Sequence, residues 1–306
     1  MTTDGLVVVD KPAGCTSHDV VARLRRAYGQ RRIGHAGTLD PDATGVLLVG
    51  LGRATRLLRF LQETTKTYQA TIVFGVATDT LDTSGAVLDR ITMQMTRSEV
   101  VAAAERFVGE IEQVPPMVSA IKIGGRRLHE LARQGVEVER PPRRVRVDRF
   151  EVEGFTEGAY PEATVSVDCS SGTYIRSLAA DLGAALGGFA HLRDLRRLRV
   201  GSFDAADAHP LDAIEADPAA MVLTPAAALR GMAQVVVEGE AARAVAHGAV
   251  FAPPALPDAC TDAGNFAIVD GDGALLAVYE RRGAALKPAV VIAVEPPAPS
   301  EPRSDG

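Results

Sequence analysis

The segment 32–45 combines side chains suited to catalysis with the backbone of a tight turn. It reads Arg-Ile-Gly-His-Ala-Gly-Thr-Leu-Asp-Pro-Asp-Ala-Thr-Gly, with one histidine, two aspartates and three glycines. Glycine lets the backbone approach a ligand closely, and the Asp40–Pro41 step favours a turn over a helix interior. An apolar run at 46–49 predicts a buried strand directly after this turn, so the Asp40 carboxylate is placed for chemistry and is the candidate catalytic residue. The alternative is a turn aspartate that caps its own backbone.

The whole string from Gly34 to Gly45 resembles the catalytic motif of the TruB-type tRNA pseudouridine synthases. The resemblance implies that Asp40 is the essential catalytic aspartate. It also implies that His35 occupies the space vacated by a flipped-out base and that Thr38 binds substrate beside it. For His35 the alternative is a histidine that only hydrogen-bonds within the turn.

Further segments match the same family in order, so the resemblance covers roughly residues 5–200. The string Asp-Lys-Pro-x-Gly near the N-terminus places Lys11 and Pro12 beside the active-site loop, where both are assigned to substrate binding. The string Lys-Thr-Tyr implies that Tyr68 stacks on the target base and takes part in proton transfer. A tyrosine in a half-buried strand is otherwise an ordinary core residue.

The string Cys-Ser-Ser-Gly-Thr-Tyr-Ile-Arg, which ends at Arg176, completes the implied pocket. The resemblance pairs Arg176 with Asp40, and an arginine partner keeps a carboxylate ionised and oriented. It also places Tyr174 at the border of the pocket and Leu195 in its lining. A structural ion pair is the alternative for Arg176.

A basic stretch follows the Pro-Pro step at 115–116. From Lys122 to Arg149, nine basic side chains outnumber four acidic ones. The resemblance implies an RNA-clamping insertion at about 117–149, whose phosphate contacts give affinity without reading sequence. A solvated charged face is the alternative. The candidate RNA-binding residues are Lys122, Arg126, Arg127, Arg143 and Arg144.

Charge is unevenly distributed along the chain. The net charge is −6, yet residues 200–306 hold six basic and fifteen acidic side chains, so the first 199 residues carry +3. The three cysteines include no Cys-x-x-Cys pair, which argues against disulfides and structural zinc. Because no apolar run approaches the ~20 residues of a membrane span and the N-terminus has no secretory pattern, we expect a cytoplasmic protein.

The apolar pattern predicts an α+β fold with a mixed, largely antiparallel sheet and flanking helices, rather than alternating βαβ units. We expect a catalytic domain over 1–230, a small β-rich domain over 231–296 and a disordered tail over 297–306. The β-rich domain resembles a PUA-type module, which implies RNA binding. Strands are expected at 5–10, 45–50, 66–74, 117–123, 144–154, 163–169 and after 193, and helices at 16–28, 53–61, 97–108 and 173–186.

The resemblance implies an enzyme that isomerises uridine to pseudouridine at position 55 in the T-arm stem-loop of tRNA, acting on a flipped-out base. The reaction exchanges an N1–C1′ bond for a C5–C1′ bond without redox change. The sequence contains no phosphate-binding loop, dinucleotide fingerprint or metal-ligand spacing, so we expect no cofactor and no metal. We expect a monomer without an obligate protein partner.

Three other functions fit parts of the pattern. A non-catalytic tRNA-binding protein on the same scaffold is opposed by the intact Asp40, Tyr68 and Arg176. A guide-RNA-directed relative would carry lysine-rich terminal extensions, which this sequence lacks. A hydrolase with Asp40 and Asp42 as its carboxylate pair requires the two groups to flank one bond, and two residues in one turn need not do so.

Overall fold

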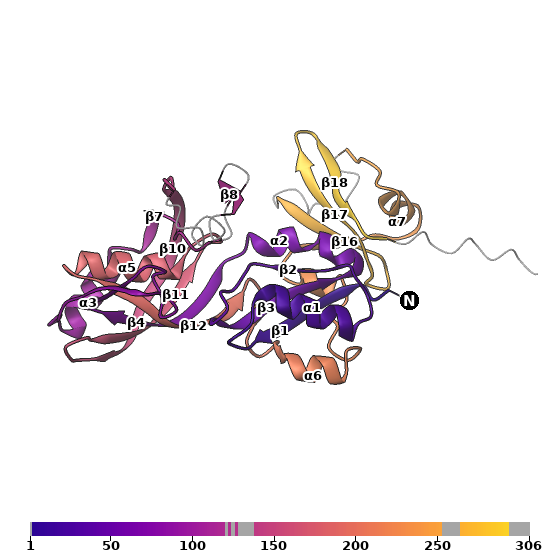
Figure 1. Ribbon diagram of the computed structural model, residues 1–306. Coiled ribbons are helices and arrows are strands. Elements are labelled where there is room, and N and C mark those ends of the chain that lie inside the picture. The colour runs from indigo at the N-terminus through magenta and orange to yellow at the C-terminus, as the bar shows by residue number, and fades with distance from the viewer. Residues whose placement is uncertain (1, 120–121, 124–125, 128–137, 253–263, 294–306) are drawn as a thin grey trace, which may run out of the picture.

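The computed structural model describes residues 2–119, 122–123, 126–127, 138–252 and 264–293. Within these residues, ten strands form a large mixed sheet (Figure 1). In spatial order they are β14 (His209–Pro210), β1 (Gly5–Lys11), β3 (Thr44–Leu51), β12 (Ala190–Val200), β4 (Lys66–Phe74), β11 (Glu162–Cys169), β10 (Arg143–Thr156) and β7 (Gly109–Gln113), with β2 (Ile33–Ala36) on β3 and β13 (Phe203–Asp204) on β12. Only the β1–β14 and β3–β12 pairs among them are parallel, which confirms the predicted α+β class.

Strands β1 and β3 are buried on both faces, as their unbroken apolar sequences predicted. The face with Val7 and Val9 packs against α1 (Ser17–Ala27) and α6 (Leu211–Ala216). The opposite face, with Leu6 and Val8, belongs to the apolar cluster that includes α2 (Leu58–Gln62). Thr16 begins α1 with a capping box, so the predicted start of this helix is confirmed.

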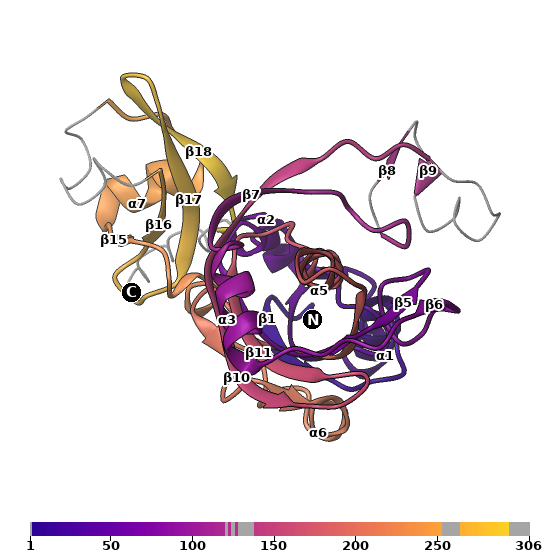
Figure 2. The ribbon, with the colours of Figure 1, turned by 90° about the vertical axis from the view of Figure 1, so that its left-hand side faces the viewer.

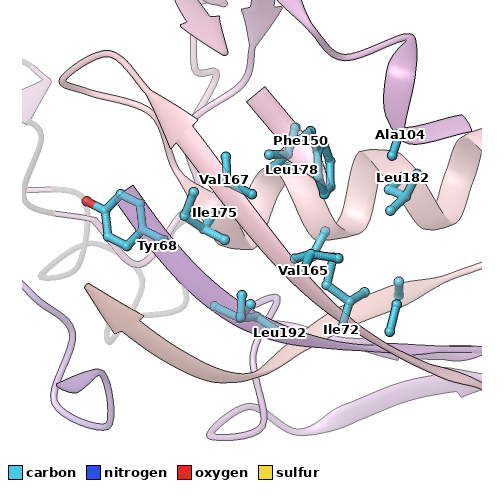
Figure 3. Close-up of a cluster of buried hydrophobic side chains, with 14 of the residues drawn as sticks. Tyr68, Ile72, Ala104, Phe150, Val165, Val167, Ile175, Leu178, Leu182 and Leu192 are labelled. Carbon is cyan, nitrogen blue, oxygen red and sulfur yellow. The ribbon is translucent and has the colours of Figure 1, made fainter. Parts of the chain in front are cut away.

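The other half of the large sheet is apolar on one face only. In β4 the inward side chains alternate as predicted, from Tyr68 through Ile72 to Phe74. They pack beneath α3 (Arg97–Glu105) and α5 (Ile175–Ala185). Figure 3 shows Tyr68 at the rim of this cluster, with its hydroxyl pointing away from the other labelled side chains.

Several elements differ from the prediction. The helix expected over 53–61 is divided into a short 3₁₀ helix, η1 (Gly52–Arg56), and α2. Its start requires glycine, because Gly52 has a φ of +56° and a Cβ there would lie 2.2 Å from an Asp4 carboxylate oxygen. The helix expected from about Thr173 begins at Ile175, after an N-cap residue that offers no side-chain cap. Strands β2 and β7 were not predicted, and β2 contains His35, which was expected in the loop.

The basic insertion is described only in part. Residues 117–119 form no strand, residues 120–121 lie outside the described residues, and β8 (Lys122–Ile123) pairs with β9 (Arg126–Arg127). The strand expected over 117–123 is therefore found only at its end. The tail expected over 297–306 also lies outside the described residues.

A four-stranded sheet and one helix form the C-terminal part. They are β15 (Gln234–Val236), β16 (Asn265–Val269), β17 (Leu275–Arg282), β18 (Ala285–Val291) and α7 (Gly239–Ala246). Val278 and Val290 join the same apolar cluster as Leu58 and Leu61, so this sheet is packed onto α2. Figures 1 and 2 both show α2 between the C-terminal sheet and the β8–β9 pair.

Candidate active site

A cavity of about 440 Å³ opens where the two halves of the large sheet meet. Strands β3 and β12 pair there through Arg196 with Thr44 and Arg197 with Gly45. Gly45 has a φ of +102°, and a Cβ there would lie 2.2 Å from the Arg197 carbonyl oxygen, so this close approach requires glycine. The predicted site residues that line the cavity are Thr38, Asp40, Tyr68, Tyr174, Arg176 and Leu195.

Asp40 and Arg176 form the predicted ion pair in the wall of this cavity. Arg176 Nε lies 3.0 Å from Asp40 Oδ2, and Arg176 Nη2 donates to Asp40 Oδ1 at 3.2 Å. The arginine side chain is only 4% exposed, whereas that of Asp40 is 41% exposed. Burial raises the pKa of Asp40, and the Arg176 charge opposes this rise without reversing it. The arginine thus orients an accessible carboxylate but does not lower its pKa below the ordinary value.

A second carboxylate, Asp82, shares the same guanidinium and was not predicted. Its Oδ2 lies 3.4 Å from Arg176 Nη1, and its charge adds to the rise in the pKa of Asp40. Asp82 lies in the turn between β5 (Val76–Thr78) and β6 (Val87–Arg90), where it accepts hydrogen bonds from the hydroxyls of Thr80 and Ser84. The sequence Asp-Thr-Ser-Gly indicates only a turn.

Backbone carbonyls hold the remaining donors of Arg176. Its Nη1 donates to the Thr80 carbonyl at 3.0 Å, and its Nη2 donates to the Val118 carbonyl at 2.8 Å. Next to Thr80, Leu81 has a φ of +63°, the only positive φ of a non-glycine among the residues the structure describes. The turn that carries Asp82 is therefore held in an unfavourable conformation at the point where it contacts Arg176.

The turn that presents Asp40 is supported from beneath. Ser17 Oγ donates to the Leu39 carbonyl at 3.2 Å and accepts from the Leu39 N–H at 3.0 Å. Lys11 is fully buried, and its Nζ donates to three carbonyls, two of which belong to Pro41 and Ala43 at 2.9 and 2.8 Å. The structure thus places Lys11 under the turn rather than in the cavity wall, and its donors are engaged by the backbone. This geometry favours a structural role for Lys11 in supporting the turn over the substrate binding that was predicted for it.

Arg197 lines the cavity together with Tyr68 and was not assigned a role in the site. It is 1% exposed, and it donates to the Val46 carbonyl at 2.7 Å and to the Gly37 carbonyl at 3.0 Å. Burial raises the pKa of the Tyr68 hydroxyl, which Arg197 opposes through its charge and a hydrogen bond. The sequence signal that could have identified Arg197 is its position two residues after Leu195 in a strand, which places both side chains on the same face.

Lys66 also lines the cavity and was not assigned a role in the site. Burial, together with the nearby Arg197, lowers its pKa to about 8. Its Nζ donates to the Gln62 and Thr64 carbonyls at 2.9 and 3.2 Å. Lys66 therefore caps the end of α2 at the edge of the cavity.

The other predicted residues lie away from the cavity lining. His35 faces His18 of α1 edge to face, with ring centroids 5.4 Å apart, and burial lowers its pKa to about 4. Pro12 is exposed and does not line the cavity. Arg143 and Arg144 are exposed at the start of β10. The side chains of Lys122, Arg126 and Arg127 lie outside the description.

One alternative function, the carboxylate-pair hydrolase, receives no support from the 440 Å³ cavity. Asp42 is exposed and does not line the 440 Å³ cavity, so no Asp40–Asp42 pair spans it; both residues line a smaller cavity of about 180 Å³. The part of the chain that the structure describes contains no cluster of three or more side chains suited to hold a metal ion. In that part, no helix has the length and apolar character needed to cross a membrane.

Two family models match this chain consecutively. The N-terminal domain of the TruB family pseudouridylate synthases matches residues 25–175, and the tRNA pseudouridylate synthase B C-terminal domain matches residues 176–232. Asp40, Tyr68 and Tyr174 fall within the first match, and Arg176 begins the second.

Relatives and solved structures agree with these matches. The tRNA pseudouridine synthase B of Symbiobacterium thermophilum is 52% identical over 80% of this chain and 82% of its own. That of Thermobifida fusca is 47% identical over 95% of this chain and 99% of its own. An H/ACA RNP bound to a substrate RNA containing 2′-deoxyuridine has a chain with a TM-score of 0.72 and 25% identity, covering 95% of this chain and 85% of that one. A Cbf5-Nop10-Gar1 complex has a chain with a TM-score of 0.72 and 28% identity, covering 94% and 84%. This protein belongs to the TruB family of pseudouridylate synthases.

Proposed function

We propose that this protein isomerises uridine to pseudouridine at position 55 in the T-arm loop of tRNA, with Asp40 as the nucleophile and without a cofactor. The observation that carries the proposal is the Asp40–Arg176 pair, in which a buried guanidinium orients a carboxylate that faces the cavity. The tRNA substrate is inferred from the relatives, which are named tRNA pseudouridine synthase B. The T-arm position is inferred from the resemblance of the Asp40 motif.

The reaction makes limited demands on the protein. The N1–C1′ bond breaks, the base turns, the C5–C1′ bond forms, C5 loses a proton and N1 gains one. Asp40 begins this sequence either by attack on C1′ or by removal of the C2′ proton, and both routes require its ionised form. Arg176 keeps the carboxylate in position, because its Nη2 hydrogen bond and its Nε ion-pair contact each engage one oxygen of the Asp40 side chain.

The apolar part of the cavity is suited to hold the flipped uracil. Tyr68 and Leu195 both line the cavity, so a base could stack on one and pack against the other. Burial raises the pKa of the Tyr68 hydroxyl, which keeps it protonated at neutral pH. We assign Tyr68 the roles of stacking and proton transfer, and Tyr174 and Thr38 the border of the cavity.

The RNA-binding surface is proposed to lie on the basic stretch, with Lys122, Arg126, Arg127, Arg143 and Arg144 contacting phosphates. His35, which is neutral at physiological pH because of its lowered pKa, is proposed to occupy the space that the flipped base leaves. We propose a catalytic domain over 1–230 and an RNA-binding C-terminal domain over 231–296. The protein is proposed to act as a monomer in the cytoplasm, without a guide RNA or an obligate protein partner.

The test is tritium release from tRNA that carries [5-³H]uridine, with no added cofactor. The parent protein is expected to release tritium, and Asp40→Asn is expected to release none above background. Asp42→Asn is the matched control on the same turn, and it is expected to react as the parent does. With a tRNA that has cytidine at position 55, the tritium release that comes from that position should be absent. Binding of tRNA without release by the parent would reject catalysis and leave an RNA-binding protein.

A further inference from the structure

The segment Gln113–Ser119, here called the strap, crosses the start of α5 beside the cavity. It leaves the end of β7 and contains the Pro115–Pro116 step, whose two rings fix φ and remove two N–H donors. Gln113, Pro115, Pro116 and Ser119 are buried. A short rigid segment with buried ends is suited to hold its neighbours in one position.

Gln113 binds the strap to the residue before α5. Its Nε2 donates to the Tyr174 carbonyl at 3.0 Å, and its Oε1 accepts from the Tyr174 N–H at 2.7 Å. Gln113 is 2% exposed, so the amino group and the carbonyl oxygen of its side-chain amide would be buried without partners if Tyr174 moved. Because Tyr174 offers no side-chain cap to α5, the amide of Gln113 fixes the backbone where the helix begins.

The rest of the strap holds Arg176 and Ser177 of α5. Ser177 Oγ donates to the Val114 carbonyl at 2.9 Å, and Ser119 lines the cavity together with Tyr174. Arg176 Nη2 donates to the Val118 carbonyl at 2.8 Å and to Asp40 Oδ1 at 3.2 Å. One nitrogen thus joins the strap to the carboxylate, and a shift of the strap changes the geometry of the ion pair.

The strap is also joined to the basic stretch. Arg140 Nη1 donates to the Pro115 carbonyl at 3.1 Å, and Gln113 pairs with Arg143 in the β7–β10 ladder. Arg143 is one of the residues to which we assign phosphate contacts. The described residues therefore provide a continuous set of contacts from the proposed RNA-binding surface to Asp40.

We infer that Gln113 is a positioning residue for the Asp40–Arg176 pair, and that the strap transmits contact of RNA with the basic stretch to this pair. The inference rests on the proposed function. Gln113 makes no contact with substrate in this inference, because both Nε2 and Oε1 of its side chain are hydrogen-bonded to the Tyr174 backbone. A displacement of the pair by about 1 Å is enough to cost about 100-fold in rate.

The test compares Gln113→Leu and Gln113→Met with Gln69→Leu. Gln69 is the matched control, because it is exposed on β4 and donates to Glu153 away from the cavity. At saturating protein, the single-turnover rate of tritium release should fall about 10- to 100-fold in both Gln113 variants. The Kd for tRNA should stay within about threefold, since the basic side chains are unchanged. Gln69→Leu should match the parent in both measurements.

A second readout separates positioning from a loss of folding. The charged groups that act on Asp40 are Arg176 from α5, Asp82 from the β5–β6 turn and Lys11 from β1. If Arg176 withdraws, its opposition to the raised pKa of Asp40 weakens, so the acid limb of the rate–pH profile should move to higher pH. A merely destabilised variant would lose folded protein without moving this limb.

The outcomes distinguish the inference from the proposed function. No tritium release by the parent would reject the proposed function itself. Release by the parent with unchanged rates in Gln113→Leu and Gln113→Met would overturn the inference alone. A loss of rate in proportion to weaker tRNA binding, or to a lower folded fraction by circular dichroism with an unmoved acid limb, would also overturn it. Gln113→Met preserves side-chain length, so at least one variant retains the packing of β7.

Discussion

The cavity and the face on which the C-terminal sheet docks both depend on arginine, but with different partners. At the cavity, the buried Arg176 binds the carboxylates of Asp40 and Asp82. At the docking face, three more exposed arginines bind the backbone of β18 and the residue after it. The pairs are Arg53 with the Ile292 carbonyl, Arg56 with Val291 and Arg59 with Ala289, at 2.7, 2.8 and 2.6 Å.

The two regions differ in whether the group bound by arginine stays exposed to a substrate. At the docking face the guanidiniums satisfy carbonyls at an edge strand, and the carboxylate that Arg53 also binds, that of Asp4, is only 17% exposed. In the cavity the partner is a carboxylate that keeps 41% of its side chain exposed. The same side chain therefore serves chemistry only where its partner stays accessible, which leads us to expect large catalytic effects at Arg176 and small ones at the docking face.

The largest contrast should come from replacing arginine by lysine in both regions. Arg176→Lys keeps the charge but loses the planar fork that binds Asp40 through two nitrogens. We expect the single-turnover rate to fall about 100- to 1000-fold, as for the loss of an oriented donor. Arg59→Lys is the matched control and should stay within about twofold. Tritium release measures both, and equal losses in the two variants would remove the distinction between the regions.

A smaller effect is expected from Asp82→Asn, which removes a negative charge near Asp40 and leaves the Asp40 side chain itself unchanged. The negative charge of Asp82 raises the pKa of Asp40, so its removal should lower that pKa. Because the reaction needs ionised Asp40, the acid limb of the rate–pH profile should move to lower pH. Loss of the second partner of Arg176 should reduce the plateau rate about tenfold.

The control for this variant is Asp42→Asn, which removes a carboxylate from the exposed side of the same catalytic turn. It should leave both the plateau rate and the acid limb as in the parent. An acid limb that moves to higher pH in Asp82→Asn would show that the loss of Arg176 orientation outweighs the loss of repulsion. That result would contradict the electrostatic role assigned to Asp82.

The sequence predicted those parts of the fold that have a clear local pattern. Strands β1 and β3 contain continuous apolar runs and β4 alternates from Tyr68 to Ile72, so their burial was evident. By contrast, β2 is four residues long with Gly-His at its centre, and β7 carries polar residues at three of five positions. Both are strands because of their partners in the sheet, and such pairing leaves no periodic signal in a short segment.

The cavity residues likewise divide into those marked by a local sequence motif and those without one. Asp40, Tyr68, Arg176 and Leu195 could be named because their motifs are long, and the structure brings all four to one cavity. Asp82, Arg197 and Gln113 act through contacts with residues remote in sequence; Gln113, for example, is 61 positions from Tyr174. Their local sequences indicate a turn, a basic strand and a polar strand end. Such positioning residues emerge only when the chain is folded.

The smallest effect should come from the docking face itself. In the double variant Arg56→Gln/Arg59→Gln, two hydrogen bonds to β18 are weakened on an exposed surface, at about 0.5 kcal/mol each, the lower end of the usual range. Hydrogen exchange should quicken in β17 and β18, while the shared apolar cluster with Leu58 and Val278 keeps the sheet in place. The single-turnover rate should remain within about twofold of the parent.

Arg281→Gln is a suitable control for the change in charge, because Arg281 is exposed on β17 and outside these contacts. It should leave hydrogen exchange in β18 unchanged. The decisive measurement is the rate in the double variant, because α2 ends at the edge of the cavity, where Lys66 caps it. A loss of rate as large as that of Asp82→Asn would mean that the docking face also sets the geometry of Asp40. Arg56 and Arg59, which bind carbonyls of β18, would then contribute to catalysis from a distance. Both regions would position Asp40, one by direct contact and the other through α2.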